Sequence, residues 1–128
     1  MKNIFDYFAE QYRLIGNLSG IEVEKYEEQV LEENRGNLRI RLRFLDNSLV
    51  EVSESIQVID DTPQWISYRY HYQDSIGNLI FRYDNAPHHP EVKTHPDHKH
   101  LFDKVLASTH PGIETVLKEI KENLVRQG

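Results

Sequence analysis

A series of segments in which apolar and polar residues strictly alternate constrains the fold of this chain more than any other feature. The clearest is NLRIRLRFL, residues 37–45, in which apolar side chains alternate with Arg39, Arg41 and Arg43. Because successive side chains of a β-strand point to opposite faces of the sheet, this period is that of a half-buried strand. The segment therefore predicts a strand with one face on a core and its arginines on the other face.

The same two-residue period recurs downstream in LVEVSESIQV, WISYRYHYQ and LIFRYD, which span residues 49–58, 65–73 and 79–84. Short stretches typical of tight turns, RGN, DNS and DSIGN, separate these segments. Upstream, Ile21 to Glu33 has a glutamate content that suits a helix, but the turn that follows it favours a strand that pairs with the next one. We therefore predict a strand there, and four to five antiparallel strands in total.

Helical periodicity marks two segments that lie outside the predicted strands. Residues 3–13 place their apolar side chains on one helical face, with Asn3 in a position to cap the first turn. Residues 111–126 carry a similar apolar stripe and start with Pro111, which fits the first position of a helix. The sequence therefore predicts an α+β fold. We expect an antiparallel meander sheet with an N-terminal and a C-terminal helix packed on one face, in a single domain of residues 1–128.

Charge and composition narrow the class of protein. The chain has no cysteine, which excludes disulfides and thiolate zinc sites, and its net charge of −6 is atypical of proteins that coat nucleic acids. No apolar run approaches the length of a membrane span, and the first residues carry acids that a signal peptide would lack. We therefore expect a cytoplasmic protein. The open edges of a meander sheet also make a homodimer plausible.

One stretch, RYDNAPHHPEVKTHPDHKH at residues 82–100, holds five of the chain's seven histidines. One interpretation is a metal site without thiolates, for which His95, His98, His100 and Asp97 have plausible ligand spacing. Zinc, nickel, copper, manganese or iron would then be the candidate metals. This spacing matches no established metal motif. A second interpretation is a solvated loop that its prolines stiffen and that has no chemical role.

A third interpretation is metal-free cleavage of RNA by histidines. Histidine titrates near neutral pH, so one imidazole can take the 2′-OH proton while another protonates the leaving 5′-oxygen. A cation must hold the phosphate as it gains charge, and a carboxylate can orient an imidazole. The residues that supply these parts are Arg82, His88, His89, His98 and Lys99, with Asp84 and Asp97 as orienting groups.

The arginine-bearing strands suggest where a phosphate-containing substrate would bind. Side chains two residues apart on a strand lie roughly 6.6–7 Å apart, which is close to the phosphate spacing of a nucleic acid strand. The candidate binding residues are Arg39, Arg41, Arg43, Arg69, Arg82, Tyr83 and Lys99. If the neighbouring aromatic residues were exposed, they would stack on bases of single-stranded RNA. In the alternative interpretation the arginines pair with Glu51, Ser53 or the acidic first strand, and the aromatic residues form the core.

The histidine-rich stretch also resembles the signature of TumE-type proteins, the toxin components of small toxin–antitoxin modules. The similarity lies in FRYDNAPHHP, residues 81–90, and in the element from His95 to His100 that ends in Lys-His. WISYRYHYQD, residues 65–74, resembles the aromatic strand of the family, whereas the first 60 residues match only in layout. The resemblance implies a toxin that a cognate antitoxin neutralises.

The resemblance also carries expectations about chemistry. By position, the site residues that it implies are Arg82, Asp84, His88, His89, His98 and His100. A ribonuclease is the usual expectation for small toxins, so we expect an endoribonuclease that needs no cofactor, with RNA as its substrate. The alternatives are a hydrolase that holds a divalent metal on histidines and carboxylates, and a non-enzymatic protein that uses the loop to bind a partner.

Overall fold

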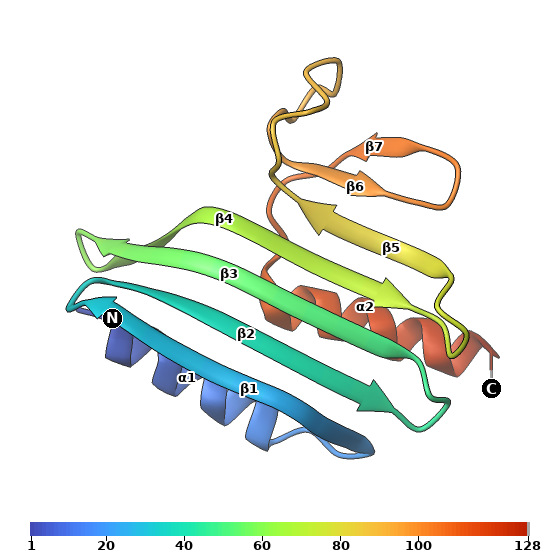
Figure 1. Cartoon of the computed structure of the whole chain (residues 1–128), viewed down its shortest axis with the longest axis horizontal. Helices are drawn as coiled ribbons and strands as arrows, with labels where there is room; N and C mark the ends of the chain where they lie inside the picture. The colour runs from blue at the N-terminus through green and yellow to red at the C-terminus, as the bar shows by residue number, and fades with distance from the viewer. Residues whose placement is uncertain (128) are drawn as a thin grey trace.

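The computed structural model describes residues 1–127, which form two helices and one antiparallel sheet of seven strands (Figure 1). Helix α1 (Ile4–Gly16) precedes the sheet in sequence, and helix α2 (Gly112–Gln127) follows it. The strands lie side by side in the order of the chain. They are β1 (Ile21–Glu32), β2 (Arg35–Phe44), β3 (Leu49–Ile59), β4 (Thr62–Gln73), β5 (Leu79–Asp84), β6 (His98–His100) and β7 (Val105–Ala107).

The α+β class and both helices are confirmed, and Ile21–Glu32 is a strand as predicted. The predicted number of strands is too low, because β6 and β7 lie in a region that we expected to be irregular. Each has only three residues, which is too short for a two-residue period to stand out. No helix among the described residues has the length and apolar character needed to cross a membrane.

Both helices pack on the same face of the sheet, which we call the covered face (Figure 1). The alternation in β2 predicts this face correctly, since Leu38, Ile40 and Leu42 are fully buried in the shared core. The idea that the aromatic residues are exposed for base stacking is wrong, because they point to the same covered face. The buried aromatic residues of β4 and β5 are Tyr68, Tyr70, Tyr72, Phe81 and Tyr83.

A bulge changes the alternation at the start of β4. The pairing of β3 with β4 shifts register between Ser55 and Ile56, so the simple pattern fails there. Trp65 consequently lies on the covered face, where its Nε1 donates to Glu54 at 2.9 Å. Ile66, which simple alternation would put on the same face as the buried tyrosines, is 45% exposed instead.

Helix α1 lies close against the sheet at Gly36. Asn3 caps this helix as predicted, because its side chain accepts a hydrogen bond from the Asp6 backbone N–H. A Cβ atom at Gly36 would lie 2.6 Å from the Gln29 carbonyl oxygen and 2.9 Å from Ile4 Cγ1. Glycine is therefore required here to let the helix lie against the strand.

Strand β1 forms one edge of the sheet and is exposed along most of its length. Its side chains include Glu22, Glu24, Glu27, Glu28 and Glu32, so the free edge is strongly acidic. Charged side chains on an edge strand oppose pairing with another copy of the same edge. A homodimer thus stays a prediction, and this edge is a poor surface for it.

Candidate functional site

The sheet face opposite the helices, which we call the open face, collects the charged residues of five strands. Strand pairing places side chains from these strands in two neighbouring rows across the sheet. The first row contains Arg39, Ser53, Arg69, Asp84 and His98. The second row contains Arg41, Glu51, His71, Arg82 and His100. Both rows end at the histidine-rich segment, so the arginines and histidines share one surface.

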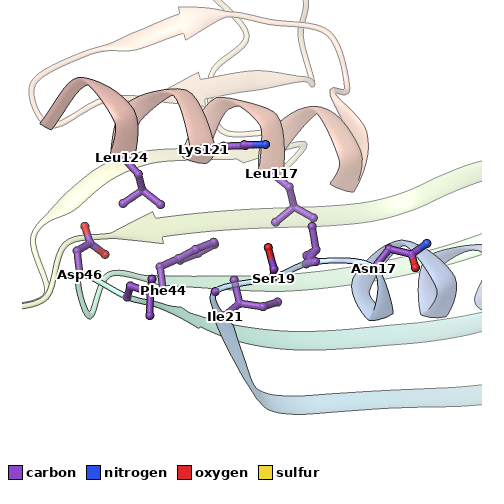
Figure 2. A pocket seen from close by; sticks show the side chains of 11 residues that line it. Asn17, Ser19, Ile21, Phe44, Asp46, Leu117, Lys121 and Leu124 are labelled. Carbon is purple, nitrogen blue, oxygen red and sulfur yellow. The ribbon is translucent and has the colours of Figure 1, made fainter. Parts of the chain in front are cut away.

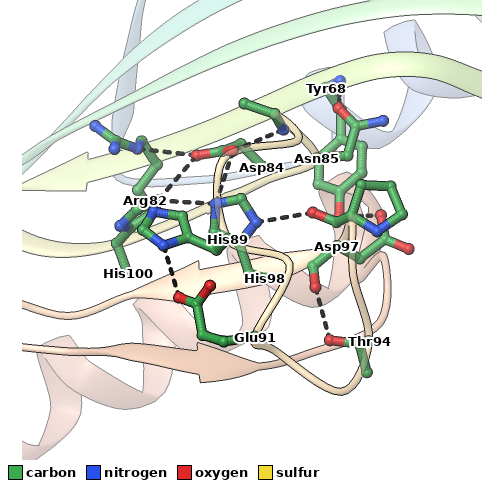
Figure 3. Close-up of polar contacts among 12 residues, drawn as sticks. Tyr68, Arg82, Asp84, Asn85, His89, Glu91, Thr94, Asp97, His98 and His100 are labelled. Carbon is green, nitrogen blue, oxygen red and sulfur yellow. Dashed lines mark hydrogen bonds and ion pairs between the residues drawn. The ribbon is translucent and has the colours of Figure 1, made fainter.

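Three side chains converge at the end of these rows (Figure 3). His98 Nε2 lies 3.0 Å from Asp84 Oδ1 and 2.9 Å from His100 Nε2. His100 Nε2 lies 3.4 Å from Asp84 Oδ2. Together with His89, which lies beside them, these residues are called the histidine–aspartate cluster below.

Asp84 ends β5 and is held from two sides. Its carboxylate accepts hydrogen bonds from Arg82 Nε at 3.1 Å and from the Ala86 backbone N–H at 3.0 Å. The side chain is almost fully buried, so these donors and the histidines supply the polar contacts that water would otherwise provide. The carboxylate is therefore fixed in orientation before any ligand binds.

His98 is the buried centre of the cluster, with 1% of its surface exposed. Its Nδ1 lies 2.8 Å from the Pro96 carbonyl oxygen. Because a carbonyl oxygen only accepts, Nδ1 carries a hydrogen and donates to it. His98 Nε2 is thus the atom that faces Asp84 and His100.

His89 closes the cluster on the side of the loop that follows β5. Its ring centroid lies 5.0 Å from that of His98 and 5.3 Å from that of His100. Its Nδ1 lies 3.0 Å from Glu91 Oε1, which leaves Nε2 free to face other groups. One ring nitrogen from each of the three histidines lies within 4.8 Å of the others.

The electrostatics of the site favour a neutral His100. Burial is the main cause that lowers its pKa below the ordinary value, and the positive charge of Arg82 adds to the effect. The carboxylate of Asp84 opposes this shift but does not cancel it. A neutral imidazole next to a cation offers a lone pair for a proton or a metal ion.

Several residues that we predicted for the site lie elsewhere. His88 and His95 are exposed in the loop and do not belong to the group of converging histidines. Asp97 Oδ1 accepts a hydrogen bond from Tyr68 Oη at 2.8 Å, so this carboxylate fixes the loop to β4. The metal set predicted from spacing thus shares only His98 and His100 with the cluster.

Tyr83 and Lys99, which we predicted to bind substrate, point to the covered face. Lys99 Nζ forms an ion pair with Glu119 of α2 at 2.7 Å, and Tyr83 Oη donates to the same carboxylate at 2.5 Å. Lys99 also lies over the Tyr83 ring, at 4.8 Å from its centroid. These residues attach β5 and β6 to α2 and are separated from the cluster by the sheet.

Four of the arginines on the open face divide into two pairs. Arg41 forms an ion pair with Glu51 at 3.3 Å and Arg43 with Glu24 at 3.0 Å, so the alternative interpretation is confirmed for these two. Arg39 and Arg69 are exposed and line a polar groove of about 250 Å³ on the open face. They occupy the row that leads to Asp84 and His98.

A second polar network, which the sequence did not indicate, is buried on the covered face. Glu54 accepts hydrogen bonds from Tyr7 Oη at 2.5 Å, from Trp65 Nε1 at 2.9 Å and from Tyr70 Oη. His110 Nε2 lies 2.7 Å from Tyr70 Oη. Burial raises the pKa of Glu54, although its three donors oppose the rise, and burial lowers the pKa of His110 to about 4.

An apolar pocket of about 480 Å³ lies between the end of α1, the end of β2 and α2 (Figure 2). Phe44, Leu117 and Leu124 are among its lining side chains, and Leu45 beside them is largely exposed. No residue of the histidine–aspartate cluster lines it. Its ionisable lining residues include Asp46 and Lys121 but no histidine, so the cluster, where three imidazoles meet a carboxylate, is the better candidate for a catalytic site.

The fold and the site define a small α+β protein with a histidine–aspartate cluster and arginines on the open face of its sheet. A family model described as Toxin TumE matches residues 11–127, which is nearly the whole chain, and the chain belongs to this family. The resemblance of the histidine-rich stretch is thereby confirmed, and the family supports a toxin role. Comparison with curated proteins and with solved structures finds no match.

Proposed function

We propose that the protein is the toxin of a toxin–antitoxin module and that it cleaves RNA at the histidine–aspartate cluster. The observation that carries this proposal is the convergence of His98, His100 and Asp84 beside Arg82, on an open face that also bears exposed arginines. Imidazoles and a guanidinium at one surface supply the proton-transfer groups and the cation that phosphodiester cleavage needs. A cognate antitoxin, of the kind that toxin families imply, would neutralise the activity.

The positions of the residues suggest their roles. Burial lowers the pKa of His100, which favours the neutral ring, and the side chain is partly exposed, so its ring accepts the 2′-OH proton as the 2′-oxygen attacks phosphorus. His89, on the solvent side, donates a proton to the 5′-oxygen as the P–O5′ bond breaks. The products are a 2′,3′-cyclic phosphate and a 5′-hydroxyl. His98 is too buried to touch RNA and acts as a positioning residue that links Asp84 to His100.

Arg82 neutralises the phosphate that reacts. Its Nε donates to Asp84, so the two terminal nitrogens of the guanidinium remain for phosphate oxygens. About a third of its side chain is exposed, at 32%, which allows this contact. Arg69 on β4 and Arg39 on β2 lie in the neighbouring row, which leads to Asp84 and His98, and they bind further phosphates of a single strand.

The experiment incubates the purified chain with single-stranded RNA beside the variants His100→Ala and His95→Ala. His95 is a matched control because it lies in the same loop, is exposed and stands outside the cluster. We expect His95→Ala to cleave like the parent chain and His100→Ala to lose at least 100-fold in rate, the scale of one acid–base group. The products should end in a 2′,3′-cyclic phosphate.

Two results would contradict the proposal. The first is a folded His100→Ala variant, checked by circular dichroism, that cleaves at the parent rate. The second is the absence of cleavage by the parent chain in a preparation that still arrests growth when expressed. That result would assign the histidine-rich loop to partner binding.

A further inference from the structure

The potential ligand atoms of the histidine–aspartate cluster lie close together, with one ring nitrogen from each of the three histidines within 4.8 Å of the others and Asp84 beside two of them. The separations are 2.9 Å between His98 Nε2 and His100 Nε2 and 3.0 Å between His98 Nε2 and Asp84 Oδ1. Nitrogen and oxygen ligands lie about 2.0–2.2 Å from a tetrahedral zinc ion, which puts them roughly 3.3–3.6 Å apart. Small side-chain rotations that move these atoms apart by about 0.5 Å would bring them to this spacing. His89 supplies a third imidazole within 4.8 Å.

The groups behind these atoms orient them in the way that metal sites require. His98 donates from Nδ1 to the Pro96 carbonyl oxygen, and His89 Nδ1 faces the carboxylate of Glu91. Asp84 is held by the Ala86 N–H and by Arg82. A ligating imidazole whose other nitrogen is bonded to a carbonyl or a carboxylate has a fixed tautomer and points its free nitrogen at the metal.

The donor set selects one class of ion. Three imidazoles with one carboxylate suit zinc, cobalt, nickel and other first-row divalent ions. Magnesium and calcium prefer all-oxygen ligands and fit this set poorly. The nitrogen atoms of the site must carry no proton to bind such an ion, and the proposed cleavage requires the same atoms to exchange protons.

We propose that His89, His98, His100 and Asp84 bind one first-row divalent ion and that this ion silences the RNA cleavage proposed above. The binding part stands on the geometry alone, and the silencing part rests on the proposed function. An ion bound to His100 Nε2 requires the hydrogen of this ring to be on Nδ1, so the ring has no lone pair left to take the 2′-OH proton. It also holds His89 on the ion instead of at the leaving oxygen. Binding of the metal ion and transfer of the catalytic protons therefore cannot occur at these two imidazoles at the same time.

The test titrates the metal-free chain with Co²⁺ and records the visible absorption that cobalt shows in a tetrahedral site. We expect saturation at one equivalent, release of protons on binding and displacement of cobalt by Zn²⁺. His89→Ala and His100→Ala should each lower cobalt affinity at least 10-fold, whereas His95→Ala should match the parent chain. His89 and His100 are chosen because both are partly exposed, so their loss leaves the core intact.

RNA cleavage is measured in the same samples with and without one equivalent of Zn²⁺. Cleavage by the metal-free chain that stops with zinc would support the whole proposal. Failure of cobalt to bind, or equal binding by His89→Ala, would overturn the metal site and leave the proposed function untouched. Bound cobalt with no cleavage under either condition would support the site while overturning the proposed function. Cleavage that appears only with metal would overturn both the silencing and the metal-free mechanism.

Discussion

Burial of His110 makes the stability of the fold depend on pH. His110 precedes α2 and packs against the rings of Trp65 and Tyr68, with centroids 4.1 Å and 4.4 Å away. Tyr70 donates its hydroxyl hydrogen to Glu54, so its oxygen accepts from His110 Nε2, which carries the hydrogen of a neutral ring. Protonation would place a charge among aromatic rings. We therefore predict that the free energy of unfolding falls at low pH, where His110 is protonated in the unfolded chain but not in the folded one.

The sign and size of the effect follow from the lowered pKa. The unfolded chain binds a proton near pH 6.5, but the folded chain binds it only near pH 4, so the unfolded state holds more protons between these values. The contribution of neutral His110 is complete above pH 6.5 and is lost as the pH falls towards 4. At about 1.4 kcal/mol per pH unit the upper bound is about 3 kcal/mol. Because His110 is partly exposed, solvent screens its charge, and we expect a contribution of about 1–2 kcal/mol to the free energy of unfolding.

The assay measures the free energy of unfolding in urea between pH 4 and pH 7 for the parent chain and for His110→Phe. Phenylalanine keeps an aromatic ring against Trp65 but cannot gain a proton. The parent chain should lose about 1–2 kcal/mol more than the variant over this range. Glu54 titrates in both proteins, so the difference between them isolates His110. Parallel profiles would refute the reasoning, and His95→Ala, which removes an exposed histidine, should follow the parent chain.

Three further predictions concern folding and binding. Glu54→Leu removes the acceptor of Tyr7 Oη, Trp65 Nε1 and Tyr70 Oη, although Tyr70 keeps His110 as a neighbour. Urea unfolding should therefore show a loss of about 3 kcal/mol or more, and a smaller loss would mean that the network is weak. Gly36→Ala should lower the free energy of unfolding by about 1–3 kcal/mol because its Cβ meets α1. Gly16→Ala is the control, since a Cβ there has nothing within 4 Å, and equal melting temperatures of the two variants would contradict the prediction. Arg69→Ala should weaken RNA binding and lower the slope of log binding constant against log salt concentration by about one. Arg43→Ala should have a smaller effect, because Arg43 is already paired with Glu24. Fluorescence anisotropy at several salt concentrations measures both slopes, and equal effects of the two variants would contradict the prediction.

Periodicity predicted the long elements because each alternates over enough residues to show which face is buried. The bulge at Trp65 and the three-residue strands β6 and β7 escaped prediction, since neither a single register shift nor three residues produce a readable pattern. Of the site, the histidine-rich stretch could be read directly. The selection of His89, His98 and His100 over His88 and His95 could not, because it depends on how β6 pairs with β5.

That pairing also sets when the site can exist during synthesis. Asp84 ends β5, while His98 and His100 belong to β6, and the carboxylate of Glu119 in α2 holds β5 and β6 from the other side. Chains emerge from the ribosome N-terminus first, so the four long strands are available to fold before any of these histidines. The cluster comes together only after β6 and most of α2 have been translated. The acid–base activity that we propose for the cluster would therefore be absent from a nascent chain until these segments have emerged.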